Sequence, residues 1–257
     1  AGLRLQQYPY YDYKNHGIDF DAMIDTFNKL GVGDLVLLHG CCHNPCGADL
    51  SRDQWDRLAD LFESRGIVPF LDFAYQGLAE GLEEDAYGVR LMAERLDEVI
   101  VVTSCSKNFG LYRERVGMTS VISKDVKQAK VAQSNLGNVA RGIYSMPPDH
   151  GAAIVSRVLN DNELSAIWIE ELAQMRERLN DLRHLIVDKL NERGAPRDFS
   201  FIASERGMFS FLGISQEQAI RLREEFHVYT LESGRINVAG INQSNVDYVA
   251  DAIVAIL

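Results

Sequence analysis

The first half of the chain alternates short apolar runs with segments whose apolar residues recur every three or four positions. The runs predict strands at 35–39, 67–72, 99–103 and 116–123, and the helical spacing predicts helices at 52–62, 84–96 and 124–140. Ser51 has the residue type of a helix N-cap and Gly66 that of a C-cap. Strands that alternate with helices favour right-handed crossovers and a mostly parallel sheet.

The pattern changes in the second half. Residues 162–193 contain no proline or glycine, and they predict one helix longer than is usual in a globular domain. Beyond it the sequence predicts a helix at 216–226, a closing helix from Asn245, and short strands at 199–202, 207–213, 228–231 and 235–238. We therefore expect an α/β protein with a large domain at 1–173 and a small α+β domain at 174–257, joined by the long helix.

The composition of the chain excludes several classes of binding partner. The net charge of -11 argues against binding to nucleic acid or to an anionic membrane, since both need clustered lysine and arginine. No apolar stretch approaches the ~20 residues of a membrane-spanning helix, and we expect a cytoplasmic protein. A zinc site built from Cys41, Cys42, His43 and Cys46 is disfavoured because adjacent cysteines are poor ligands for one tetrahedral ion. We predict no metal and reduced thiols.

Polar side chains gather where the predicted strands of the first half end or begin. The carboxyl ends of parallel strands are where α/β proteins bind ligands. The residues at these positions are Asn44 after the first strand, Asp72 and Tyr75 at the second, Ser104, Ser106 and Lys107 at the third, and Arg115 just before the fourth.

These residue types suit a phosphorylated pyridine cofactor. A desolvated lysine amine becomes nucleophilic, and serine hydroxyls with an arginine can hold phosphate oxygens. A carboxylate can pair with a ring nitrogen and keep the ring an electron sink. Taken singly, Asp72 is an ordinary strand-end cap, Tyr75 a half-buried aromatic and Lys107 a turn lysine, while His39 and His43 are packing residues. Their joint occurrence favours pyridoxal phosphate.

Four segments, 43–47, 72–77, 104–117 and 233–240, closely resemble the class I aminotransferases, a fold-type I family that uses pyridoxal phosphate. The nearest branch is the aspartate and aromatic-amino-acid aminotransferases. For the cofactor, the resemblance implies Lys107 as the Schiff-base lysine, Asp72 on the pyridine nitrogen, Tyr75 and Asn44 on the phenolic oxygen, and Ser104, Ser106 and Arg115 on the phosphate.

The resemblance also implies substrate-binding roles. Arg235 matches the arginine that binds the substrate α-carboxylate, Phe209 matches an aromatic near that carboxylate, and Asn44 is expected to bind substrate as well as cofactor. Arg141 matches the arginine that the family lends to the neighbouring subunit's site to bind a distal carboxylate. A homodimer with shared sites is therefore expected.

The implied activity is transfer of an amino group from aspartate or an aromatic amino acid to a 2-oxo acid such as 2-oxoglutarate. Met146 stands where aspartate-specific members carry asparagine, and its apolar bulk fits a pocket that also admits aromatic side chains. A lyase or decarboxylase reaction on the same scaffold, and a non-catalytic protein, stay open as alternatives.

The chain begins without methionine and lacks the long N-terminal segment of the family. We expect it to be the C-terminal part of a longer enzyme. By itself it would hold only part of the phosphate site, so we expect weak cofactor binding and poor turnover from this segment alone.

Overall fold

The computed structural model describes residues 2–257, which form two compact units. The sheet unit comprises Gly31–Cys41 and Ser51–Arg176. The C-terminal unit comprises the residues up to Leu30 together with Cys42–Leu50 and Glu177–Leu257. The chain passes from the first unit to the second within its longest helix. The domain division at 1–173 and 174–257 remains a prediction. The two compact units divide the chain differently, because two N-terminal segments belong to the same unit as the C-terminal part.

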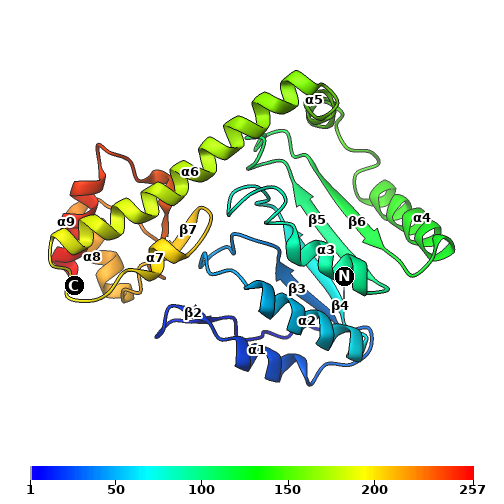
Figure 1. Ribbon diagram of the computed structural model, residues 1–257, viewed down its shortest axis with the longest axis horizontal. Helices are drawn as coiled ribbons and strands as arrows, with labels where there is room; N and C mark the ends of the chain where they lie inside the picture. Colours follow the sequence, from blue (N-terminus) through cyan, green and yellow to red (C-terminus); the bar gives the residue numbers. More distant parts are fainter. Residues whose placement is uncertain (1) are drawn as a thin grey trace. The chain divides into compact units, whose positions relative to one another are not determined.

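The sheet unit is built on four strands in the order β3 (Leu35–His39), β4 (Val68–Phe73), β5 (Val99–Ser104) and β6 (Gly117–Ile122). The first three run parallel and β6 pairs antiparallel with β5. Helices α2 (Arg52–Arg65) and α3 (Tyr87–Arg95) pack against each other on the sheet, as Figure 1 shows. The prediction of an α/β fold with a mostly parallel sheet is confirmed.

Helix α2 begins and ends where its sequence indicates. The Ser51 hydroxyl accepts from the Gln54 backbone N–H at 3.2 Å, and the Gln54 side chain accepts from the Ser51 N–H at 2.9 Å, which forms a capping box. Gly66 ends the helix in the left-handed conformation with φ 66°. These caps fix where α2 begins and ends, and the chain then continues into β4.

Three further helices complete the sheet unit and lead out of it: α4 (Val126–Ile143), α5 (His150–Leu159) and α6 (Asn162–Glu192). The long helix predicted at 162–193 is α6. Helix α5 was not expected from the sequence. None of the helices in the part of the chain that the structure describes is long and apolar enough to cross a membrane.

The C-terminal unit has a core of its own. It contains the hairpin β1 (Tyr11–Asp12) and β2 (Gly17–Ile18), helices α1 (Phe20–Phe27), α7 (Phe201–Ser204), α8 (Gln216–Phe226) and α9 (Val246–Ile256), strands β7 (Phe209–Phe211) and β8 (Arg235–Asn237), and the 3-10 turn η1 (Val238–Gly240). Strands β7 and β8 pair antiparallel. One face of α6 packs into this core through apolar side chains that include Leu182, Ile186 and Leu190.

Two strands predicted in this unit are wrong. Residues 199–202 form a turn into α7, because Phe199 and Ile202, three positions apart, are both fully buried, which is helical spacing. Residues 228–231 are irregular. The Val228 N–H donates to the Leu222 carbonyl at the end of α8, so it serves to end the helix and not to pair with a strand, while the Val228 side chain packs against the core and Tyr229 is 79% exposed.

Candidate active site

Lys107 lies in the loop that leaves strand β5. Its ammonium nitrogen is 4.4 Å from the centre of the Tyr75 ring, a distance typical of a cation–π contact. Tyr75 is buried, with 6% of its surface exposed, and it follows the end of β4. Because β4 and β5 are neighbouring parallel strands, their ends bring these two residues together as the sequence predicted.

Asp72 stands at the same edge of the sheet. It pairs in register with His39 of β3, and its carbonyl accepts from the Gly40 N–H at 2.8 Å. Burial lowers the pKa of His39, the Asp72 carboxylate opposes that shift, and the Lys107 ammonium adds to it. One carboxylate and one ammonium therefore have opposite effects on the pKa of an imidazole at the ends of three neighbouring strands.

Ser104, Ser106 and Arg115 come together on the lysine loop. The Ser106 N–H donates to the Ser104 hydroxyl at 3.2 Å, and one guanidinium nitrogen of Arg115 lies 3.5 Å from the Ser106 hydroxyl and 2.9 Å from the Tyr112 carbonyl. Arg115 has φ 52°, in the left-handed region that non-glycine residues rarely adopt. Two hydroxyls beside an exposed guanidinium form a suitable site for a phosphate group.

A buried carboxylate that the sequence analysis missed holds the loop after Tyr75. Asp85 is 6% exposed. Its two oxygens accept four backbone N–H groups, from Gly77 at 2.8 Å, Ala79 at 3.1 Å, Glu80 at 2.8 Å and Gly81 at 3.2 Å. The signal in the sequence is weak, because acidic residues are also common on helix surfaces.

A second group of predicted residues lies within the C-terminal unit. Arg235 donates to the Asn44 side-chain oxygen at 3.2 Å, and its guanidinium carbon is 4.6 Å from the centre of the Phe209 ring. Phe209 and Arg235 come from the paired strands β7 and β8. An arginine held between an amide oxygen and an aromatic face is well placed to bind a carboxylate with two parallel hydrogen bonds.

An arginine beneath this group was also missed. Arg183 of α6 is fully buried and donates to the main-chain carbonyls of Ile202 at 2.9 Å, Arg206 at 3.0 Å, Gly207 at 2.9 Å and Phe209 at 2.7 Å. Its other neighbour is the Glu205 carboxylate at 3.5 Å. The signal was available, because Arg183 falls within the apolar stripe of α6 four residues after Leu179.

Glu205 is itself buried, with 3% of its surface exposed. Ser210 donates its hydroxyl to one carboxylate oxygen and Tyr11 donates to the other at 3.2 Å. Burial raises the pKa of Glu205 to about 7, against the opposing effects of the Ser210 hydrogen bond and the Arg183 charge. Tyr11 thereby ties the β1–β2 hairpin to the segment that leads to Phe209.

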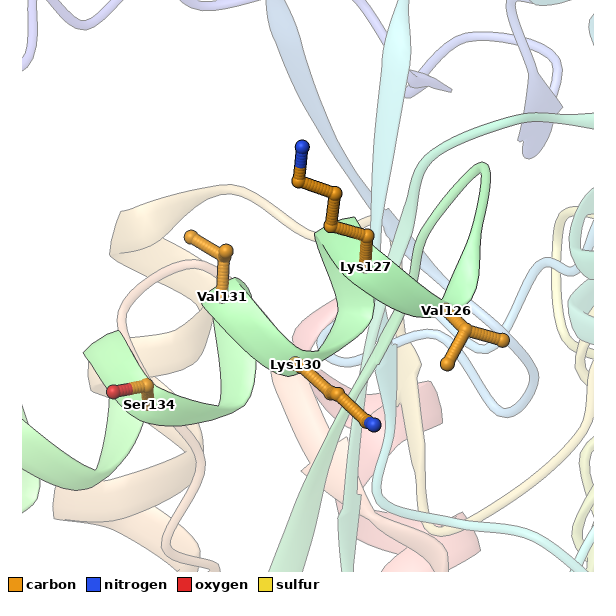
Figure 2. Close-up of a pocket in the computed structure, with 5 residues that line it drawn as sticks. All are labelled: Val126, Lys127, Lys130, Val131 and Ser134. Atoms are coloured by element: carbon orange, nitrogen blue, oxygen red, sulfur yellow. The ribbon is translucent and has the colours of Figure 1, made fainter.

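Arg141, the predicted residue for the partner's substrate site, lies on helix α4. It is exposed in the last turn of α4, and none of residues 126–143 of that helix is buried. Figure 2 shows a surface hollow on the same helix. The residues that line it are Val126, Lys127, Lys130, Val131 and Ser134. The hollow contains none of the predicted cofactor or substrate ligands.

Comparisons with known proteins show which family this chain resembles. Residues 1–253 match the family model described as aminotransferase class I and II. The chain is 51% identical over its whole length to an aspartate aminotransferase of Escherichia coli strain K12, and it spans 65% of that protein. It is 46% identical over 253 residues to an aromatic-amino-acid aminotransferase of Pseudomonas aeruginosa, of which it spans 63%.

Solved structures show the same similarity in three dimensions. An aromatic-amino-acid aminotransferase from Burkholderia pseudomallei, covalently bound to pyridoxal phosphate, matches with a TM-score of 0.97 and 47% identity over all of this chain and 64% of that one. A mitochondrial aspartate aminotransferase from Trypanosoma brucei matches with a TM-score of 0.97 and 38% identity, over 99% of this chain and 67% of that one. The chain thus spans about two thirds of the relatives that it matches.

Proposed function

Because the chain belongs to the class I and II aminotransferase family, we propose that the protein is a transaminase dependent on pyridoxal phosphate. It would move an amino group from aspartate or an aromatic amino acid to a 2-oxo acid such as 2-oxoglutarate. The observation that carries the proposal is the meeting of Lys107 with Tyr75 at the strand ends that also hold Asp72 and His39.

The residues of the sheet unit fit this cofactor. Lys107 would hold it through the amine, and Asp72 would accept a hydrogen bond from the ring nitrogen. The exposed Arg115 guanidinium and the adjacent serine hydroxyls would bind the phosphate. When bound, the cofactor supplies an electron sink for the substrate carbon that carries the amine. Tyr75 and Asn44 would donate to its phenolic oxygen.

The protein's own part in the reaction is to bind the substrate and to move one proton. Arg235 would bind the α-carboxylate of the substrate, with the Phe209 ring against the guanidinium. Once the substrate amine has displaced it, the free amine of Lys107 would take the proton from the substrate α-carbon as a general base and deliver it as a general acid to the carbon on the other side of the nitrogen, so that the amino group leaves the substrate. The contact with the Tyr75 ring positions its ammonium nitrogen on the face of an aromatic side chain.

We further propose a homodimer in which Arg141 serves the partner's substrate site. Helix α4 supports this, because its side chains include several exposed apolar ones, among them Val126 at 72% and Ile143 at 74%. Met146, just beyond α4, is 76% exposed. A helix with no buried residue and exposed valines and isoleucine is a suitable surface for a second copy.

The test is to incubate the intact protein with aspartate, and separately with phenylalanine, with and without 2-oxoglutarate. Transamination predicts one 2-oxo acid product for each glutamate formed, and product only when the acceptor is present. Product that accumulates equally without an acceptor supports a lyase or decarboxylase instead. No product under either condition supports a non-catalytic role.

A further inference from the structure

Next to the Arg235 group lies a buried charge, Arg183, which donates to the main-chain carbonyl of Phe209. Arg183 is fully buried, and burial lowers the pKa of its guanidinium while Glu205 opposes that shift. An arginine is costly to place in a core unless its N–H groups are used. Here its two terminal nitrogens donate to four carbonyls, all of them in the segment 202–209. This segment ends on Phe209.

Two routes lead from Arg183 to Arg235. The first is direct, because Arg183 binds the Phe209 carbonyl at 2.7 Å and the Phe209 ring lies against the Arg235 guanidinium. The second passes through Arg206, whose carbonyl accepts from Arg183 at 3.0 Å and whose N–H donates to the Gly47 carbonyl at 2.8 Å. The Gly47 N–H donates to the His43 carbonyl and closes the turn that contains Asn44. Asn44 in turn accepts a hydrogen bond from Arg235.

Gly47 shows how closely these segments fit. Its φ is +77°, and a Cβ there would lie 2.5 Å from the Phe209 carbonyl oxygen and 3.1 Å from a terminal nitrogen of Arg183. Only glycine fits this position without moving one of the two. The contact between the turn at 43–47 and the segment at 202–209 is therefore made directly over the Arg183 guanidinium.

We infer that Arg183 is a positioning residue for substrate recognition: by holding segment 202–209 and, through Gly47, the turn at 43–47, it fixes the orientation in which Arg235 meets a substrate carboxylate. The inference rests on the proposed function in taking Arg235 as the carboxylate-binding arginine. Arg183 acts through its neighbours and makes no contact with substrate. Replacing Arg183 should therefore weaken carboxylate binding more than it slows the chemical step.

The test compares Arg183→Lys with Arg193→Lys in the intact protein. Arg193 is the control, because it follows α6 and its guanidinium donates to the Lys189 carbonyl at 3.2 Å and to the Asp247 carboxylate of α9 at 2.8 Å, none of which belongs to β7, β8 or the turn at 43–47. Both variants lose guanidinium hydrogen bonds, so a general loss of stability affects both. Only Arg183→Lys should change how Arg235 binds a carboxylate.

The measurements are KM and kcat for the amino donor and, without turnover, the Kd of succinate by calorimetry. For Arg183→Lys we expect KM and the succinate Kd to rise about tenfold while kcat changes less than about threefold, because misplacing a binding group weakens the interactions it makes. For Arg193→Lys we expect values within about twofold of the wild type. Thermal melting of both variants reports any shared loss of stability.

Gly47→Ala gives a second, independent variant if Arg183→Lys does not fold, since its added methyl disturbs the same contact and leaves Arg183 in place. It should raise the succinate Kd in the same way. Succinate affinity that is unchanged in Arg183→Lys or in Gly47→Ala, or that falls equally in Arg193→Lys, overturns the inference. A wild type that binds succinate but transfers no amino group refutes the proposed function alone, because the effect of Arg183 on binding is still measured.

Discussion

Replacement of Glu205 by glutamine tests whether the buried carboxylate beneath the Arg235 group takes up a proton in the neutral range. Burial raises the pKa of Glu205 from its ordinary value of 4.5 to about 7, and the hydrogen bonds from Ser210 and Tyr11 and the charge of Arg183 limit the shift. Glutamine has nearly the same shape and keeps one oxygen acceptor, so Glu205→Gln removes the titration with little change in packing.

The magnitude follows from the two pKa values. At about 1.4 kcal/mol for each tenfold change in proton affinity, a rise from 4.5 to about 7 corresponds to about 3 kcal/mol of folding free energy. The native state binds this proton more tightly than the unfolded state does. The contribution to stability is therefore fully present below pH 4.5 and is lost as the pH rises through about 7.

The assay is urea unfolding of the intact protein between about pH 4.5 and pH 8 for the wild type, Glu205→Gln and a control, Glu192→Gln. The Glu192 side chain is 58% exposed. The stability of the wild type relative to Glu205→Gln should fall by about 3 kcal/mol across this range. Relative to Glu192→Gln it should change by less than about 1 kcal/mol, since exposed carboxylates contribute little.

A difference between wild type and Glu205→Gln that does not depend on pH would refute the reasoning. A wild type that gains stability relative to Glu205→Gln as the pH rises would refute it more strongly. It would mean that the attraction of Arg183, 3.5 Å away, outweighs burial and keeps Glu205 charged throughout.

Two further substitutions test the two groups of site residues. Asp85→Asn replaces one acceptor oxygen by a donor NH₂ and leaves two of the four N–H groups without a partner, which should cost about 2–5 kcal/mol in urea unfolding; a loss below about 1 kcal/mol would show that Asp85 does not hold the loop after Tyr75. Arg235→Lys loses the planar pair of donors and the contact with Asn44, so kcat/KM for the amino donor should fall about 100-fold while cofactor absorbance is kept; an unchanged KM would exclude Arg235 from carboxylate binding.

The sheet and its helices could be predicted because local rules and tertiary packing agree there. Ser51 and Gly66 have the residue types of helix caps, and both act as caps in the structure. The runs that predict β3, β4 and β5 are apolar and bounded by polar strand ends. At Phe199 and Ile202 a short apolar run predicted a strand, but these residues belong to a turn that leads into α7.

Some contacts of the candidate site could likewise be predicted from the sequence, and others could not. Asp72 lies near the end of β4, Tyr75 follows β4 and Lys107 follows the neighbouring strand β5, so topology alone predicts that they meet. Asn44 and Arg235 are 191 positions apart, and only the resemblance to known enzymes connected them before the structure did. No local pattern could indicate that Arg183 binds the carbonyls of a segment about twenty residues further on, because that depends on how α6 packs.

The most direct test of the central claim is to reduce the intact protein with borohydride in the presence of pyridoxal phosphate and to examine its lysines by mass spectrometry. We expect the mass of the reduced cofactor on the peptide that contains Lys107, and its loss in Lys107→Arg, since arginine cannot form the linkage. A Lys107 peptide that stays unmodified, or a cofactor mass on another lysine that persists in Lys107→Arg, would contradict the account.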